Sequence, residues 1–80
     1  MSELSRLRWR CRRGMKELDI VMLAYLEQHY ETASADDQRI FEELLELQDP
    51  QLYAYLLGRE TPADAAVADV VNQLRAVLSS

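Results

Sequence analysis

The side chains best suited to chemistry lie together near the start of the chain, within residues 9–19. This stretch combines an aromatic ring, guanidinium groups, a glycine, a thioether and carboxylates, contributed by Trp9, Arg12, Arg13, Gly14, Met15, Glu17 and Asp19. Arginine and tryptophan are enriched at the energetic centres of protein interfaces. A glycine also lets a partner's backbone approach closely, since no side chain stands in the way. We therefore interpret Arg13-Gly14-x-x-Glu17 and its flanks as a protein-docking surface that contains no catalytic residue.

Two other hypotheses fit part of this stretch. A local turn that caps two helices would account for Gly14 and Glu17, and Glu17 could pair with Arg13 inside the molecule or with a donor on a partner. Nucleic-acid binding would place the arginines on phosphates and the tryptophan ring on a base. We expect no nucleic acid, because residues 17–80 carry three basic and thirteen acidic groups, a balance of −10 that repels a polyanion.

Charge is divided unevenly along the chain. Residues 1–16 carry six basic groups and one acidic group, a balance of +5, whereas the whole chain has a net charge of −5. Such a split predicts either a basic helix matched to acidic helices within the molecule or a basic face offered to a partner. The simplest alternative is a solvated surface on which basic and acidic groups partly neutralise one another.

Catalytic and metal-binding groups are scarce. His29 is the only histidine and lies near a predicted helix end, where we expect it to contact carbonyl groups or water. Cys11 is the only cysteine, so neither an internal disulfide nor a zinc set can form. We expect it to be a packed side chain, although its arginine neighbours could lower its pKa. The two glycines stand apart and form no phosphate-binding loop. We expect no enzyme activity, no metal and no cofactor bound stably by this chain.

Apolar residues recur at helical spacing in five segments, which predict helices over residues 4–12, 15–31, 35–47, 50–57 and 62–78. The segment 15–31 is apolar on two sides and should be the central helix. No segment alternates with period two, so we expect no strand. Eighty residues make a single domain, residues 1–80. Five helices with short connections predict an all-α fold, a small five-helix bundle.

The residues predicted to be buried lie on one stripe of each helix. They are Leu4, Leu7 and Cys11; Leu18, Val21, Met22, Tyr25 and Leu26, broadened by Ile20, Leu23 and Ala24; Ile40, Phe41, Leu44 and Leu45; Leu52, Tyr53, Leu56 and Leu57; and Val67, Val70, Val71, Leu74, Val77 and Leu78. Trp9 lies off its stripe, so it either folds back onto the core or stands exposed as a contact residue. Glycines are expected to end helices at Gly14 and Gly58. Cap residues are expected to start them at Ser34, at Asp49-Pro50 and at Thr61–Asp64.

At residues 9–19 the chain resembles the small assembly-factor family for the flavoprotein subunit of succinate dehydrogenase and fumarate reductase. The matching string is Trp9-x-Cys11-Arg12-Arg13-Gly14-Met15-Lys16-Glu17-Leu18-Asp19, centred on Arg-Gly-x-x-Glu. The similarity continues through Asp49-Pro50-x-Leu52-Tyr53-x-Tyr55-Leu56-x-Gly58 and Pro62-Ala63-Asp64, and so covers nearly the whole chain. Tyr53 and Tyr55 stand where bacterial relatives often have Phe and Trp, and both changes keep an aromatic ring.

The resemblance implies a five-helix bundle that binds the apo or maturing flavoprotein and promotes covalent attachment of FAD to a histidine of that partner. The resemblance also implies an assembly chaperone more than an enzyme. FAD is implied as the cofactor of the partner, since it becomes attached to a histidine of that protein. The docking residues that carry over are Arg13, Gly14 and Glu17, with Trp9, Arg12, Met15 and Asp19 beside them.

Mitochondrial members of that family carry a longer N-terminus with a targeting segment, which is absent here, so we expect a bacterial cytoplasmic protein. The chain has no apolar run approaching about 18 residues, which predicts no membrane insertion. We expect a monomer when the protein is free. Two functions remain as alternatives: an arginine-rich RNA-binding or antitoxin-like regulatory module, and a structural adaptor that uses the same face.

Overall fold

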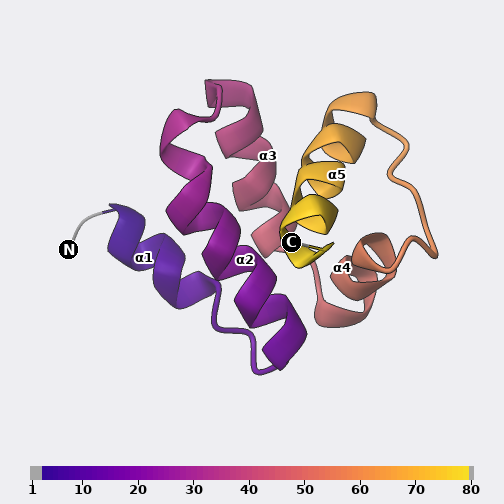
Figure 1. Cartoon of the computed structure of the whole chain (residues 1–80), viewed down its shortest axis with the longest axis horizontal. Helices are drawn as coiled ribbons and strands as arrows, with labels where there is room; N and C mark the ends of the chain where they lie inside the picture. The colour runs from indigo at the N-terminus through magenta and orange to yellow at the C-terminus, as the bar shows by residue number, and fades with distance from the viewer. Residues whose placement is uncertain (1–2, 80) are drawn as a thin grey trace.

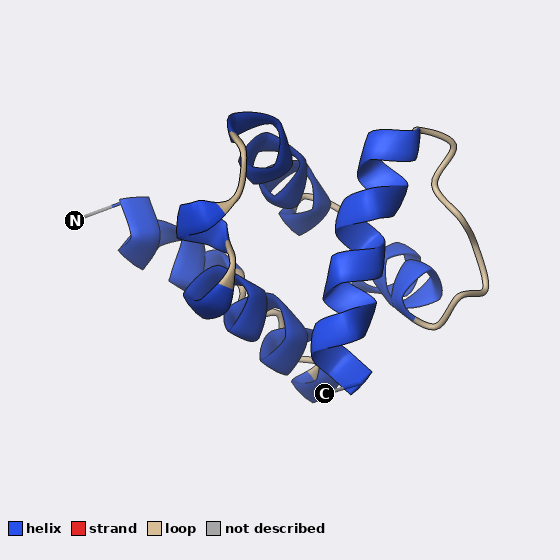
Figure 2. Cartoon of the chain, turned by 45° about the horizontal axis from the view of Figure 1, so that its top comes forward, coloured by secondary structure: helices blue, strands red, loops and turns tan. Residues whose placement is uncertain are grey.

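The computed structural model describes residues 3–79, which form five α-helices and one 3₁₀-helix with no strand among them (Figures 1 and 2). The elements are α1 (Glu3–Arg10), α2 (Lys16–Gln28), the 3₁₀-helix η1 (Tyr30–Thr32), α3 (Ala35–Leu45), α4 (Asp49–Leu56) and α5 (Ala65–Ser79). This confirms the predicted all-α, five-helix fold. A long loop joins α4 to α5, and it stands out at the edge of the molecule in Figure 2.

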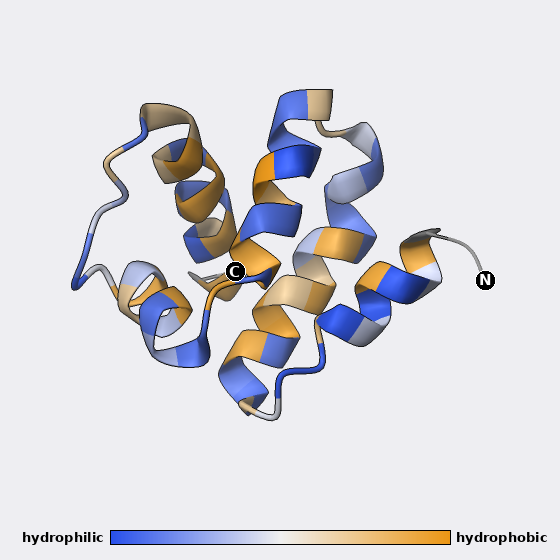
Figure 3. Ribbon diagram, turned by 180° about the vertical axis from the view of Figure 1, so that it is seen from behind, coloured by the Kyte–Doolittle hydropathy of each residue, from blue (hydrophilic) through white to orange (hydrophobic). Residues whose placement is uncertain are grey.

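Helix α2 lies at the centre of the arrangement, as its apolar pattern predicts. It packs against α1 and α4, and α5 packs against α2, α3 and α4. Figure 3 shows a run of hydrophobic residues along α2 through the middle of the molecule. Two aromatic rings join α2 to α3, because Tyr25 stacks on Phe41 with the ring centroids 4.8 Å apart. A pair of this kind adds about 1 kcal/mol beyond the area that it buries.

The core is one cluster of apolar side chains to which every α-helix contributes. Its buried members are Leu7, Cys11, Leu18, Val21, Met22, Tyr25, Leu26, Tyr30, Ile40, Phe41, Leu44, Leu45, Leu52, Leu56, Val70, Val71 and Leu74. The prediction of burial is wrong for three residues, because Ile20, Leu57 and Leu78 are 54%, 44% and 45% exposed. Leu57 and Leu78 lie at the ends of their helices, where the apolar stripe runs past the core.

Several predicted helix ends are corrected by a few residues. Helix α1 stops at Arg10, α2 stops at Gln28 before η1, and α3 stops at Leu45. The start of α3 is as predicted, since the Ser34 hydroxyl accepts the N–H of Asp37 at 3.1 Å. Such a cap satisfies one of the four backbone donors that a helix start leaves unpaired.

Asp49 does not cap α4, contrary to the prediction. It is the first residue of that helix, the N-cap position falls on Gln48, and no side chain caps the helix there. Pro50 does lie in the first turn, where its missing N–H costs no hydrogen bond. The Asp49 carboxylate instead accepts a hydrogen bond from Arg13, so its role lies in a tertiary contact.

The start of α5 differs from the predicted residue 62. The Asp64 carboxylate accepts the N–H groups of Ala66 at 2.8 Å and Val67 at 3.4 Å, so the helix begins at Ala65. Pro62 is buried in the preceding loop. Asp64 prevails over Thr61 as the cap because it lies directly before the first free N–H groups of the helix.

Gly58 ends α4 as predicted. Its φ is +78°, a conformation that residues with a Cβ rarely adopt. Gly58 N–H donates to the Tyr55 carbonyl at 3.2 Å, and Arg59 N–H donates to the Ala54 carbonyl at 2.9 Å. These two bonds form a Schellman motif, which satisfies carbonyls that the helix end would otherwise leave unpaired.

Candidate functional site

Residues 11–15 link α1 to α2 through an exposed turn at Gly14. Gly14 has a φ of +90°, and a Cβ built at this position would meet no heavy atom within 4 Å. The glycine is therefore required by the backbone conformation, while the space beside it is open. It does not cap α1, which ends four residues earlier with Cys11 N–H bonded to Leu7 and Arg12 N–H bonded to Trp9. The prediction of a sharp turn at Gly14 is confirmed, and the prediction of a helix cap there is wrong.

Arg13, next to this turn, directs its side chain into the molecule. Its Nε donates to Asp49 Oδ1 at 2.6 Å, its Nη1 donates to the Leu45 carbonyl at 2.7 Å, and its Nη2 donates to the Leu47 carbonyl. The side chain is only 10% exposed. Its backbone N–H donates to Asp19 Oδ1 at 2.6 Å. Arg13 therefore makes no ion pair with Glu17. Of the two possibilities that the sequence left open for the Glu17 carboxylate, the internal pair with Arg13 is absent.

Glu17 is exposed on the first turn of α2 and has no hydrogen bond or ion pair with any residue that the structure describes. A carboxylate here is favoured by the positive end of the helix dipole. Met15, directly before α2, is half-buried and packs against the core. The two ends of the Gly14 turn thus differ, since Arg13 and Met15 are anchored and Glu17 remains available.

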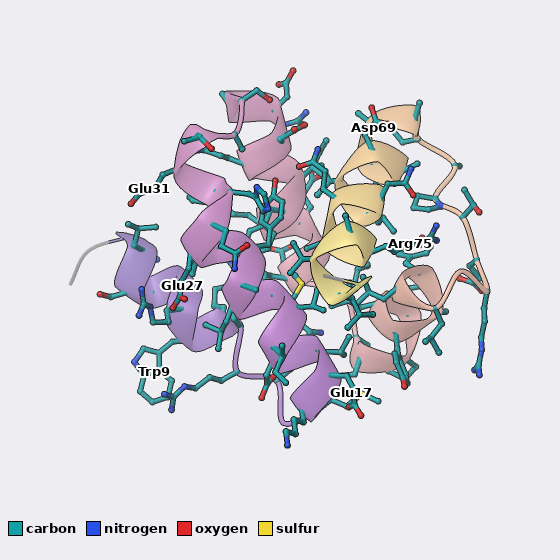
Figure 4. All side chains as sticks on the ribbon, viewed as in Figure 1. Trp9, Glu17, Glu27, Glu31, Asp69 and Arg75 are labelled. Carbon is teal, nitrogen blue, oxygen red and sulfur yellow. The ribbon has the colours of Figure 1, made fainter. Side chains whose placement is uncertain are left out.

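Trp9 stands on the outer face of α1 with 65% of its surface exposed. The alternative in which it folds back onto the core is wrong. The Arg12 guanidinium lies over its ring, 5.4 Å from the ring centroid. A shallow hollow of about 210 Å³ is lined by Ser5, Arg8, Trp9 and Arg12. Figure 4 shows both Trp9 and Glu17 along the lower edge of the molecule, Trp9 at the lower left on α1 and Glu17 to the right of the start of α2.

The basic segment is matched to acidic groups only in part. Arg8 lies 3.6 Å from Glu27, and Arg10 lies 3.9 Å from Glu46. Both pairs are well exposed and contribute little to stability. Within residues 3–79, Arg6 and Arg12 have no carboxylate partner. The predicted match of basic residues to acidic helices is therefore confirmed for Arg8 and Arg10, and a basic face offered to a partner stays a prediction for the others.

The Cys11 thiol is completely buried, which decides its chemistry. Burial raises its pKa from 9.0 to about 11, although the nearby Arg10 and Arg13 act in the opposite direction. The arginines do act to lower this pKa, as the sequence suggested, but desolvation of the thiolate outweighs their attraction, so the net shift is upward. The thiol stays protonated at neutral pH, so it packs as a small apolar group.

His29 lies at the C-cap of α2, where its backbone N–H donates to the Tyr25 carbonyl at 2.8 Å. Its ring lies 5.5 Å from the Tyr25 ring. Among residues 3–79, no three His, Cys, Asp or Glu side chains come close enough together to hold a metal ion. None of the helices in the described part of the chain combines the length and the apolar character that crossing a membrane requires.

Sequence reasoning grouped the residues of this surface but missed the partners of one of them. Trp9, Arg12, Gly14 and Glu17 are all exposed around the α1–α2 turn, whereas Asp19 is half-buried beneath it. Nothing in the local pattern indicated that Asp49, assigned as a helix cap, binds the Arg13 side chain. A contact between residues so far apart in the chain has no periodic signal in a single sequence.

Comparison with known proteins identifies the family of the chain. The model of a family described as the flavinator of succinate dehydrogenase matches residues 5–78. The FAD assembly factor SdhE of Methylococcus capsulatus is 44% identical over 78 residues, which cover 98% of this chain and 94% of that protein. The factors of the same name from Shewanella oneidensis and Coxiella burnetii are 39% identical over 75 residues and 35% identical over 74. They are covered over 92% and 90% of their lengths. The chain belongs to the succinate dehydrogenase flavinator family.

Proposed function

We propose that this protein is an assembly chaperone that binds the flavoprotein subunit of succinate dehydrogenase or fumarate reductase and promotes the covalent attachment of FAD to that subunit. The observation that carries the proposal is the open space beside Gly14, next to a Glu17 carboxylate without a partner in the described structure. An exposed glycine turn with an unpaired charge suits the close approach of another polypeptide. The names of the relatives supply the class of that polypeptide.

The docking surface in this proposal consists of Trp9, Arg12, Gly14, Met15 and Glu17. The exposed indole ring supplies apolar area to bury, and the Arg12 guanidinium over it can pair with a carboxylate of the partner. Glu17 accepts hydrogen bonds from donors of the partner. Arg13 and Asp19 belong to the same motif and lie behind this surface.

Docking acts by favouring one conformation of the flavoprotein over others. In that conformation the accepting histidine of the partner faces its flavin, and the groups that bind the dicarboxylate are aligned. Orientation alone can lower a barrier by several kcal/mol, so the helper need not donate a catalytic group. Such an effect requires that the helper bind the aligned conformation more tightly than the others. In this proposal the chain acts without enzyme activity of its own, as a cytoplasmic monomer, and FAD remains the cofactor of the partner.

A complementation experiment tests the proposal, and the chain offers a matched control. Gly14 and Gly58 both have positive φ, so an arginine at either position strains the backbone. Only Gly14 lies on the docking surface. In a strain that lacks its own assembly factor, Gly14→Arg should abolish covalent flavin fluorescence of the flavoprotein subunit in a denaturing gel. Gly58→Arg should retain it at equal protein level. Normal fluorescence with a folded Gly14→Arg protein would contradict the proposal.

A further inference from the structure

The Arg13 side chain joins three parts of the fold that are distant in the sequence. Helix α3 ends at Leu45, and the last carbonyls of a helix lack donors within it. Arg13 supplies donors to the carbonyls of Leu45 and Leu47, and its Nε binds Asp49, the first residue of α4. One guanidinium group thus caps α3 and closes the turn between α3 and α4.

The backbone of Arg13 is held as firmly as its side chain. Its N–H donates to the Asp19 carboxylate in the first turn of α2. Gly14 follows directly, and a glycine gives up more conformational freedom on becoming fixed than any other residue. Two anchors, Asp19 on the backbone and Asp49 on the side chain, therefore hold one end of a turn that would otherwise be loose.

We infer that Arg13 is a positioning residue, which keeps the Gly14 turn in its open, docking-ready shape through Asp19 and Asp49 and makes no contact with the partner. The inference rests on the proposed function of the docking surface. A contact between Arg13 and a partner would require the guanidinium to leave the Asp49 carboxylate and two carbonyl oxygens. A turn that is already ordered binds more tightly, because the ordering cost has been met during folding. If the turn is ordered in only a fraction of the molecules, the apparent affinity falls to that fraction of its full value.

A second arginine provides the control for a purely structural effect. Arg75 on α5 donates from Nε at 3.0 Å and from Nη2 at 2.6 Å to the Tyr55 carbonyl, near the end of α4. Like Arg13, it joins one helix to the last carbonyls of another. Figure 4 shows it on the opposite side of the molecule from Trp9. Loss of Arg75 should therefore destabilise the bundle and leave the Gly14 turn ordered.

The test is a double-mutant cycle on the affinity for the purified apo flavoprotein subunit, measured by calorimetry. Arg13→Gln and Asp49→Asn should each weaken binding about tenfold, and the double variant should be no weaker than the worse single variant, because both remove the same anchor. The backbone N–H of residue 13, which is bonded to Asp19, should exchange its hydrogen faster in all three proteins. Arg75→Gln should lower the melting temperature to a similar degree and leave both the affinity and the exchange at the turn unchanged.

Two results would overturn the inference. Fully additive losses for Arg13→Gln and Asp49→Asn would mean that Arg13 contributes to binding independently of Asp49, as a direct partner contact would. Unchanged affinity despite faster exchange at the turn would mean that its order does not matter for docking. If Arg13→Gln fails to fold, Asp49→Asn, which keeps the side-chain shape, decides the second point by itself.

Gly14→Arg, measured in the same titration, separates this inference from the proposed function. If that variant binds normally, the docking surface is misplaced, and the proposed function fails in its assignment of docking to the Gly14 turn. If it abolishes binding while Asp49→Asn binds like the wild type, only the positioning role of Arg13 fails.

Discussion

Arg13 and Asp49 lie 36 positions apart in the chain and are joined by a charge-assisted hydrogen bond of 2.6 Å. The bond fastens the turn between α1 and α2 to the start of α4. It also explains why the arginine of an Arg-Gly-x-x-Glu motif is almost completely buried while the glycine and the glutamate are exposed. The motif therefore combines an internal anchor with an external surface, and the two can be tested separately.

The first prediction concerns stability. Removal of the Arg13 side chain leaves the Asp49 carboxylate and the carbonyls of Leu45 and Leu47 without their donor. We expect Arg13→Ala to lower the free energy of unfolding by about 2–4 kcal/mol, as for other partly buried networks that lose one member. Arg39 forms an exposed pair with Asp36 at 3.8 Å, so Arg39→Ala should cost less than about 0.5 kcal/mol. Urea unfolding measures both, and equal losses in the two variants would refute the anchor.

The second prediction tests the corrected start of α5. The Asp64 carboxylate caps two N–H groups of that helix, whereas Thr61 lies three residues earlier in the loop. Asp64→Ala should therefore destabilise the protein by about 1 kcal/mol, and Thr61→Ala should change its stability by a few tenths at most. The same unfolding measurement compares them. A larger loss from Thr61→Ala would restore the start that the sequence predicted.

The third prediction concerns pH. Burial raises the pKa of the Cys11 thiol from 9.0 to about 11, so between these values the unfolded chain loses its proton while the folded chain keeps it. Stability should be unaffected by this group below pH 9.0 and should fall as pH rises towards about 11, by roughly 1 kcal/mol per pH unit at most. Burial also raises the pKa of Tyr25, with Asp37 acting in the same direction. Tyr25 is present in both the wild type and a Cys11→Ala variant, so it affects the stability of the two proteins in the same way.

Cys11→Ala is the comparison that isolates this group. The variant should be less stable overall, because it leaves a cavity in the core. Its free energy of unfolding should nevertheless fall less steeply than that of the wild type across the alkaline window. Parallel pH profiles for the two proteins would show that the thiol does not carry the predicted shift.

The fourth prediction concerns the kind of partner. Trp9 is the only tryptophan, so a chain labelled with 5-fluorotryptophan gives one fluorine resonance for the docking surface. Its resonance should shift when apo flavoprotein is added and should not shift with RNA at physiological salt. Arg8 and Arg10 are already paired within the molecule, and the acidic remainder repels a polyanion. A shift with RNA that weakens steeply as salt is raised would favour the RNA-binding alternative.

Much of the fold follows from patterns that a single sequence displays. The apolar stripe of α2 and the positive-φ positions at Gly14 and Gly58 come from local rules that hold wherever a helix or turn forms. The cap at Ser34 is local in the same sense, since donor and acceptor lie three residues apart. Local chemistry was therefore sufficient to predict the elements and most of the core.

Errors that local patterns could not prevent arose where packing or a distant residue determines the role of a side chain. Asp49 had the sequence context of a helix cap, but the Arg13 guanidinium provides a charged partner that a backbone N–H cannot match. Cys11 had arginine neighbours along the chain, but its position in the core decides its pKa. The exposure of Trp9 was left open because the tilt of α1 is set by packing, which periodicity alone does not determine.

The fifth prediction tests the central claim with purified components. Apo flavoprotein subunit, FAD and a dicarboxylate are incubated with or without this protein, and covalent flavin is followed over time by fluorescence in a denaturing gel. Wild-type protein should accelerate covalent attachment, Glu17→Ala should accelerate it less, and Gly14→Arg should give the rate seen with no protein added. Gly58→Arg should behave as the wild type. Acceleration by Gly14→Arg equal to that of the wild type would contradict the assignment of the Gly14 turn as the surface through which this protein acts.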